Sequence, residues 1–155
     1  VDSMSRAHEL LNELVGDIFA DILNIEEKAL RYCKIKDLSI AEMHVIEQVG
    51  DDDPKSMSEV AAALGITMGS LTTAVSRIVR KGYVKRYRPE GDRRIVQIEL
   101  TRKGRLVYRL HEKFHLNLIN QMVKGLSTDE EIVLVKVLEN INGFFKKLSK
   151  KYKEA

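Results

Sequence analysis

Two histidines lie four residues apart in the stretch His-Glu-Lys-Phe-His, residues 111–115. On a helix this spacing puts both imidazoles on one face, where they can share a zinc ion beside a carboxylate that serves as the base. A small zinc hydrolase built on His111, Glu112 and His115 is therefore the first hypothesis that the sequence raises.

The surroundings of this stretch weaken the hydrolase hypothesis. Arg109 and Lys113 lie beside it, and their positive charges disfavour a dication. No sequence element suggests a substrate cleft with an exposed edge strand. A third ligand would have to come from further along the chain, from Glu130, Glu131 or Glu139. We therefore favour a structural or pocket-lining role for the two histidines, with metal sensing as an alternative.

Long amphipathic helices must position this stretch. Thr101 precedes a predicted helix over residues 102–124, which carries both histidines. A first helix is predicted over residues 5–32, because apolar residues recur there at helical spacing. A last helix follows the capping-box pair Ser127 and Glu130 and has its own apolar face. Stripes this long must be buried against the rest of the chain or a second subunit.

The charge of the chain is unevenly distributed. The 155 residues carry a formal net charge of +3, but residues 77–113 hold 13 of the 26 Lys and Arg and only 4 of the 23 Asp and Glu. Residues 1–76 are acidic by comparison. A concentrated basic block favours a polyanionic partner, because neutralising phosphates releases counterions. A solvated basic surface is the alternative that charge alone leaves open.

Three short helices precede or enter the basic block. Ser39 with Glu42, and Ser56 with Glu59, stand at capping-box spacing, and Gly50 and Gly65 follow the helices that these boxes begin. Thr67 caps a third helix that ends at Gly82. Two short helices joined by a tight glycine-containing turn predict a helix-turn-helix.

The third of these helices has two different faces. At 100° per residue, Leu71, Val75 and Ile78 fall on one side. Small, hydroxyl-bearing and basic residues fall on the other, and no acidic residue occurs between Glu59 and Glu90. A helix on a surface without a partner more often carries pairs of Glu and Lys, so this face favours contact with DNA.

A basic β-hairpin is predicted after the third helix. Tyr83, Val84 and Tyr87 lead into a loop with Pro89 and Gly91, and Val96, Ile98 and Leu100 then alternate with polar residues. Its arms and tip carry five basic residues, namely Lys85, Arg86, Arg88, Arg93 and Arg94. Such a hairpin can lie along a DNA backbone and insert an arginine into the narrow minor groove.

The order of elements and the motif residues resemble the MarR family of bacterial transcription regulators. The resemblance rests on residues 58–104, with the wing signature Asp92-Arg93-Arg94 and the following Leu-Thr-Arg-Lys-Gly as its specific parts. It implies a mainly α fold with a small β-hairpin. We expect a winged helix-turn-helix DNA-binding domain over residues 37–101 and a helical dimerisation region formed by residues 1–36 and 102–155.

The resemblance implies a homodimeric repressor that binds a pseudo-palindromic operator in double-stranded DNA and catalyses nothing. Asp92 is expected to stabilise the wing, while Arg93 and Arg94 are the minor-groove candidates. The other expected DNA-binding residues lie at the helix-turn-helix and the arms of the wing: Ser56, Ser58, Met68, Gly69, Ser70, Thr72, Thr73, Ser76, Arg77, Arg80, Arg86 and Arg88.

Residues 25–46 and 100–115 are most similar to the repressors of fatty-acid biosynthesis genes within this family. This branch uses long-chain acyl groups carried on acyl carrier protein as co-repressor, so that protein is an expected partner. Effectors that are phenolic, redox-active, metallic or otherwise lipophilic are the alternatives. We expect no metal and no cofactor other than an acyl chain. The candidate effector pocket comprises Phe19, Ile22, Leu23, Met43, His44, His111 and His115.

The single cysteine, Cys33, excludes an internal disulfide and is interpreted as a spectator; a redox switch assisted by Lys34 and Lys36 is the alternative. The apolar runs are too short to cross a bilayer and no signal-peptide pattern is present. We therefore expect a cytoplasmic protein that does not associate with membranes.

Overall fold

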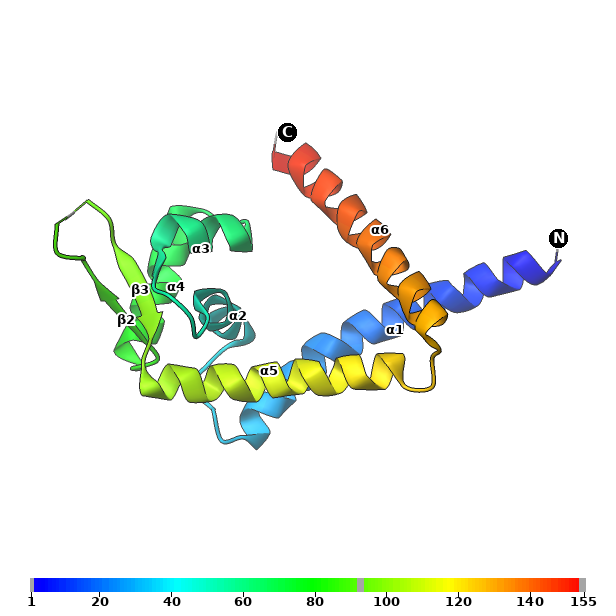
Figure 1. Cartoon of the computed structure of the whole chain (residues 1–155), viewed down its shortest axis with the longest axis horizontal. Helices are drawn as coiled ribbons and strands as arrows, with labels where there is room; N and C mark the ends of the chain where they lie inside the picture. Colours follow the sequence, from blue (N-terminus) through cyan, green and yellow to red (C-terminus); the bar gives the residue numbers. More distant parts are fainter. Residues whose placement is uncertain (1, 92–93, 154–155) are drawn as a thin grey trace. The chain divides into compact units, whose positions relative to one another are not determined.

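A computed structural model describes residues 2–91 and 94–153 of the protein. The fold is mainly helical (Figure 1). The chain divides into two compact units, residues 1–112 and 113–155. The elements follow in the order α1 (Asp2–Tyr32), α2 (Ile40–Val49), β1 (Lys55–Ser56), α3 (Met57–Leu64), α4 (Met68–Arg80), β2 (Val84–Tyr87), β3 (Gln97–Leu100), α5 (Arg102–Val123) and α6 (Thr128–Lys153). The predicted fold class is confirmed.

Side-chain caps begin the short helices where the sequence predicted them. Ser39 and Ser56 each accept a hydrogen bond from the backbone N–H of a glutamate three residues later, and the glutamate carboxylate accepts one in return. Thr67 caps α4 through the N–H of Ser70. These bonds satisfy backbone donors that the first helical turn leaves without partners, so each helix has a defined start.

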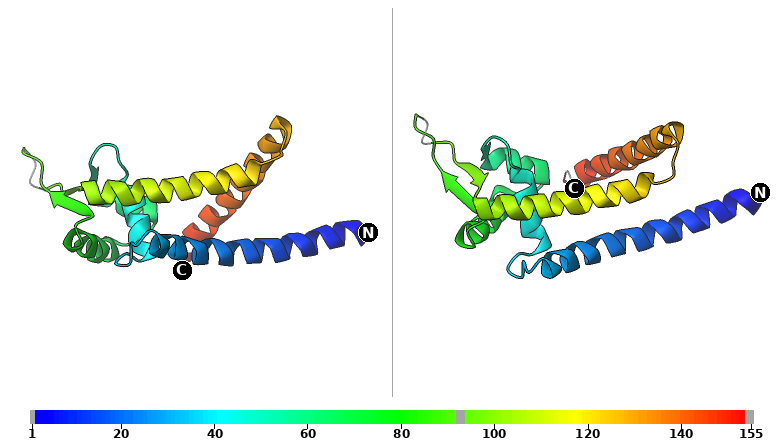
Figure 2. Two further views of the ribbon diagram at one scale, coloured as in Figure 1. Left: turned by 90° about the horizontal axis from the view of Figure 1, so that it is seen from below. Right: turned by 60° about the horizontal axis from the view of Figure 1, so that its bottom comes forward.

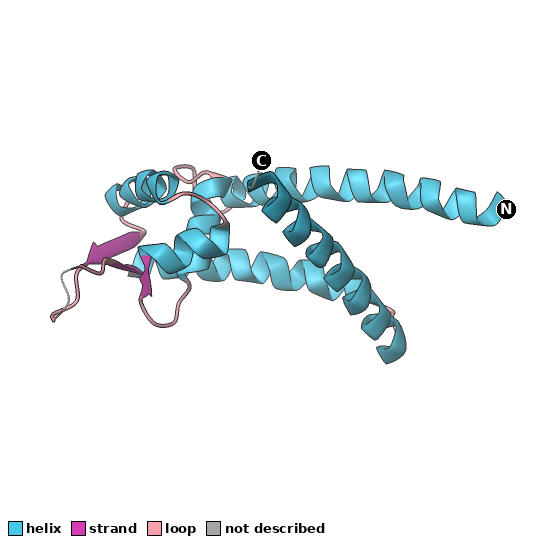
Figure 3. Cartoon of the chain, turned by 90° about the horizontal axis from the view of Figure 1, so that it is seen from above, coloured by secondary structure: helices cyan, strands magenta, loops and turns pink. Residues whose placement is uncertain are grey.

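The sheet has one strand more than the predicted hairpin. β2 and β3 pair antiparallel, with Val84 opposite Leu100. β1 adds to the free edge of β3, with Lys55 opposite Ile98. Figure 3 shows the strands as a small patch among the helices. Two residues cannot display a period of two, which is why β1 escaped sequence analysis.

The core of unit 1–112 lies between α2, α3, α4 and the sheet. Residues from all of these elements are fully buried, including Met43, Ile46, Val60, Leu71, Val75, Ile78, Tyr83 and Ile98. Both views of Figure 2 show the β2–β3 hairpin to one side of these helices. Burying such side chains stabilises the unit by about 1.5–3 kcal/mol each before the entropic cost of folding.

A glycine fixes the start of α5 against the end of the helix-turn-helix. A Cβ atom at Gly104 would lie 2.0 Å from the carbonyl oxygen of Tyr83. Thr101 holds the same junction, since its hydroxyl donates to the Gly82 carbonyl at 2.6 Å and accepts from the Gly104 N–H at 3.1 Å. Only glycine permits this close approach.

The two terminal helices keep apolar faces exposed within the chain. On α1 these residues include Leu10, Leu14, Ile18, Phe19 and Leu23, and on α6 they include Ile132, Val133, Val137, Leu138, Phe144 and Phe145. Apolar stripes of this length are uncommon on a monomer surface. Each stripe therefore requires a partner surface.

No single helix in the described residues is long and apolar enough to cross a membrane; the bent pair α3 and α4 meets that criterion by length and composition only.

Candidate nucleic-acid interface

The helices α3 and α4 form a helix-turn-helix with a bend of 110° between them. Gly65 in the turn has a φ of 66°, in the left-handed region that glycine adopts without strain. The Ile66 N–H donates to the Ala61 carbonyl at 3.1 Å and so closes the end of α3. The angle lies within the range usual for this motif.

The outward face of α4 is polar and free of acidic groups. Leu71, Val75 and Ile78 are fully buried on the inner face. The predicted contact residues on the outer face are exposed, except for the half-buried Ser76: Met68, Gly69, Ser70, Thr72, Thr73, Arg77 and Arg80. The amino-terminal end of the helix dipole adds partial positive charge beside Ser70. This face is suited to contact DNA.

The wing places its described arginines toward solvent. Arg86 and Arg88 lie on or just after β2, Arg94 lies in the connection to β3, and all three are exposed. Lys85, by contrast, forms an ion pair with Glu99 on the opposite strand. Asp92 and Arg93, the other two residues of the wing signature, lie outside the described residues, so their assignments stay predictions.

A pocket joins the helix-turn-helix to the wing. Its lining includes six of the predicted DNA-binding residues, namely Ser56, Ser58, Met68, Thr72, Arg86 and Arg94. The sequence separates these residues by up to 38 positions, and the fold brings them to one concave surface. The hydroxyl of Ser56 is already engaged as the cap of α3, where it accepts from the Glu59 N–H. The hydrogen bonds that the Glu59 carboxylate accepts from Ser56 lower the pKa of Glu59. Ser58 is therefore the more available hydroxyl for a phosphate.

Ion pairs within the protein use several basic residues of the 77–113 block. Lys81 contacts both carboxylate oxygens of the buried Glu42, at 2.8 and 2.7 Å. Lys103 contacts Asp37, and Arg105 and Arg109 both contact Asp51. Among the described residues, Arg77, Arg80, Arg86 and Arg88 form no ion pair. Fewer basic residues are thus available to contact DNA than the count from the sequence suggests.

Sequence analysis missed a polar junction beneath the interface. The Tyr83 hydroxyl donates to Asp37 at 2.6 Å, and the Lys103 ammonium lies 3.9 Å from the centre of the Tyr83 ring. Burial and the Asp37 carboxylate raise the pKa of Tyr83, while the hydrogen bond from Tyr83 lowers the pKa of Asp37. This junction ties the loop after α1 to the start of α5. Nothing in the sequence around Asp37, which precedes α2, indicated that its carboxylate would contact Tyr83.

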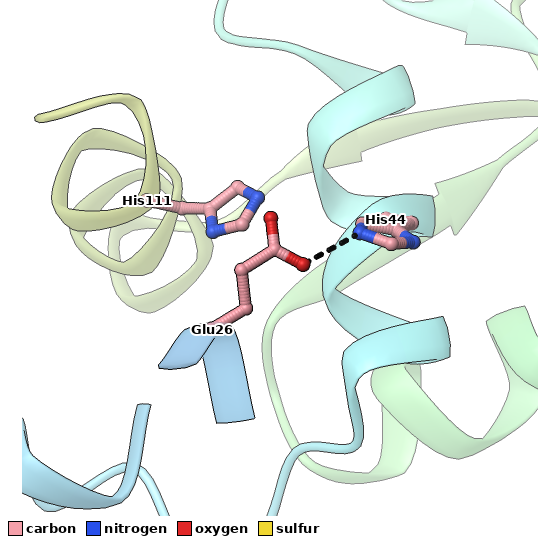
Figure 4. A group of neighbouring side chains, drawn as sticks. All are labelled: Glu26, His44 and His111. Carbon is pink, nitrogen blue, oxygen red and sulfur yellow. Dashed lines mark ion pairs between the residues drawn. The ribbon is translucent and has the colours of Figure 1, made fainter. Parts of the chain in front are cut away.

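The histidines of residues 111–115 do not form the site of a hydrolase. His111 is buried and faces Glu26 of α1 and His44 of α2 (Figure 4), whereas Glu112 is exposed. His115 belongs to unit 113–155. Glu26 was missed by sequence analysis, although it lies four residues after Ile22 and four before Leu30, on the inward line of α1.

The remaining effector-pocket candidates lie in different surroundings. Met43 is fully buried in the core, Ile22 is half-buried, and Phe19 and Leu23 are exposed on α1. Their role in binding an effector stays a prediction. Cys33 is exposed at the end of α1, and its role as a spectator also stays a prediction.

Comparison with known proteins identifies relatives of this fold. The MarR family model matches residues 36–95. The transcriptional regulator PchR of Bacillus subtilis is 22% identical over 86% of this chain and 88% of that protein. The uncharacterised transcriptional regulator YfiV of the same organism is 30% identical over 67% of this chain and 69% of that protein.

Among solved structures, Streptococcus pneumoniae FabT in complex with DNA is 40% identical. That similarity covers 91% of this chain and 99% of the other, with a TM-score of 0.83. The named relatives are transcriptional regulators, which confirms the prediction that this chain is not an enzyme.

Proposed function

Since the chain belongs to the MarR family and is a DNA-binding transcriptional regulator, we propose that it is a homodimeric repressor of fatty-acid biosynthesis genes. In this proposal a long-chain acyl group, delivered by acyl carrier protein, is the co-repressor. The observation that carries the DNA-binding part is the acid-free outer face of α4 next to the arginine-lined pocket of the wing.

The geometry supports a specific mode of binding. The amino-terminal half of α4 enters the major groove, which is about 12 Å wide, so that its hydroxyls and Arg77 reach base edges. Arg94 follows the backbone toward the minor groove, where the potential is most negative. Ser58, at the start of α3, donates to a phosphate.

The exposed apolar faces of α1 and α6 support a homodimer. Each face is a continuous stripe within one chain, and a two-fold axis would allow the same residues of two chains to bury one another. A dimer presents two copies of α4, and a pseudo-palindromic operator with half-sites about one helical turn apart then matches the symmetry of the protein.

The fatty-acid part rests on resemblance. Residues 25–46 and 100–115 are similar to the fatty-acid repressors, and the 40% identity to FabT extends over most of the chain. An acyl chain that binds more tightly to the DNA-competent dimer geometry would shift the population toward it.

A direct test measures operator affinity with and without the co-repressor. An operator is first selected from random DNA by the full-length protein, and its Kd is then measured by fluorescence anisotropy. Long-chain acyl-acyl carrier protein should lower this Kd by about fivefold or more, while carrier protein without an acyl chain should leave it unchanged. An unchanged or raised Kd with the acyl form would refute the co-repressor proposal and leave DNA binding intact.

A further inference from the structure

We propose that Glu26, His44 and His111 form a binding site for one divalent ion of the zinc class. The three residues come from α1, α2 and α5, and all belong to unit 1–112. Each offers one ligand atom, and these atoms all lie within 4.8 Å of one another. Figure 4 shows the Glu26 carboxylate between the two imidazoles. This replaces our sequence-based expectation that the protein binds no metal.

The burial of Glu26 is the first argument. Glu26 is only 4% exposed to solvent, and His111 is 5% exposed. A carboxylate removed from water requires a compensating positive charge. The contacts of Glu26 include the imidazole of His44, which is cationic only when protonated. A bound dication would add positive charge next to this carboxylate, with the lone pairs of the two neutral imidazoles as ligands.

The spacing of the donor atoms is the second argument. The His44 Nε2 and Glu26 Oε2 atoms are 3.6 Å apart, which is too long for a good hydrogen bond. Ligands held 2.0–2.1 Å from a tetrahedral zinc ion lie about 3.3 Å from one another. The imidazole centres of His44 and His111 are 6.1 Å apart, with their planes inclined by 53°. Small side-chain adjustments are enough to bring the three donors around one ion.

The chemical nature of the donors selects the ion. Two imidazole nitrogens and one carboxylate oxygen suit zinc and neighbouring transition metals, whereas magnesium and calcium prefer oxygen ligands alone. The Glu47 Oε2 atom lies 3.8 Å from His111 Nε2. Glu47 is partly exposed, so it can orient the His111 ring through its second nitrogen or leave the fourth position to water.

Metal binding here would join three helices rather than support hydrolysis. α2 packs against α3 and α4, the two helices of the helix-turn-helix. An ion shared by α1, α2 and α5 would therefore restrain α2 and, through it, the helix-turn-helix. Glu112, which would have to act as the catalytic base of a hydrolase, is exposed and is not one of the three clustered residues. The proposal does not depend on the acyl co-repressor, and the two effectors can be tested separately.

The experiment uses the full-length protein after removal of metal with a chelator. Zinc is titrated in competition with a chromophoric chelator, and one ion per chain is expected. Glu26→Gln and His44→Gln should each weaken zinc affinity by about 10- to 100-fold or more. His8→Gln, an exposed histidine on α1, is the matched control and should leave the affinity unchanged. Cobalt substitution should give the intense visible spectrum of a four-coordinate ion.

Because His111 is buried, its substitution could unfold the protein, so the test uses the half-exposed His44 instead. Circular dichroism of each variant shows whether it is folded. Zinc affinity that survives Glu26→Gln and His44→Gln in folded proteins would overturn the proposal. So would loss of zinc with His115→Gln while His44→Gln retains it, because that result places the ion on the pair within residues 111–115. Absence of zinc binding in the competition would also overturn it.

Discussion

The amphipathic helices α4 and α6 differ in where their apolar residues lie. On α4, Leu71, Val75 and Ile78 are buried within the chain, which frees the opposite face for DNA. On α6, Leu138, Phe144 and Phe145 stay exposed. A hydrophobic stripe that the chain itself buries stabilises the monomer fold, and one that it leaves exposed indicates association. The same sequence pattern thus has two meanings that only the structure separates.

Loss of an aromatic side chain on α6 should have the largest effect. Phe144→Ala is expected to weaken dimerisation by about 3–5 kcal/mol per subunit. In the proposed dimer each subunit would lose a ring that the interface buries, and the substitution would leave a cavity there. Sedimentation velocity over a range of concentrations would measure the shift to monomer. Tyr87→Ala, on the wing, is the control. A dimer of unchanged affinity would remove α6 from the interface.

A truncation on the buried face of α4 acts instead on the fold of each chain. Leu71→Ala should reduce the free energy of unfolding by about 2–5 kcal/mol through lost burial and a cavity. Urea denaturation at one fixed protein concentration measures it, because a dimer's stability depends on concentration. The neighbouring exposed Thr72→Ala should stay within about 0.5 kcal/mol. Equal effects for the two variants would contradict the assignment of the faces.

On the outer face of α4, the expected change is in recognition. Arg77→Ala should cost about 1–3 kcal/mol of operator affinity if the guanidinium contacts a base edge. The comparison of operator with random DNA by anisotropy separates base contact from phosphate contact. Lys136→Ala, a basic residue on α6, serves as the control. A loss of equal size on random DNA would assign Arg77 to the backbone.

The wing should contribute a smaller and less selective effect. Arg94→Ala is expected to weaken operator and random DNA alike, and to reduce the slope of log K against log salt by about 1. Titrations at several salt concentrations measure this slope. A slope unchanged from that of the parent protein would exclude a phosphate contact by Arg94.

The smallest effect concerns pH and the ion pair beneath α4. Burial raises the pKa of Glu42, but Lys81 and the Ser39 cap outweigh it, so the pKa is lowered from its ordinary 4.5. The stability that this carboxylate contributes is fully present above that value and is lost as the pH falls through the folded-state pKa. Lys81→Met should therefore flatten the decline of the urea midpoint in acid below about pH 4.5, whereas Lys146→Met should follow the parent protein. A decline as steep in Lys81→Met would contradict this coupling.

Local patterns predicted much of the fold. The caps Ser39, Ser56 and Thr67 act within three residues, and the alternation of Ile98 and Leu100 is visible along the chain, so short-range rules suffice. The strand β1 and the junction of Tyr83 with Asp37 depend on partners 40 or more residues away. No local pattern encodes such contacts.

The candidate sites divide in the same way. The DNA-binding face of α4 follows from helical periodicity, because its residues share one helix. The cluster of Glu26, His44 and His111 draws one residue from each of three helices, so helical spacing along one segment could not predict it. Counting charges overestimated the number of basic residues available to DNA for a related reason, since Lys81 and Lys103 pair with acidic residues 39 and 66 positions away along the chain.

The contact of Gly104 with Tyr83 has a mechanical consequence for α5. With its start fixed there, α5 can move in this unit mainly by tilting about Gly104. At 1.5 Å per residue, His111 lies about 10 Å along the helix from that point. A tilt of about 1° moves His111 by only about 0.2 Å, which its side chain can absorb, whereas a larger tilt would carry His111 away from Glu26 and His44. An ion held by these three residues would therefore limit how far α5 tilts relative to α1 and α2.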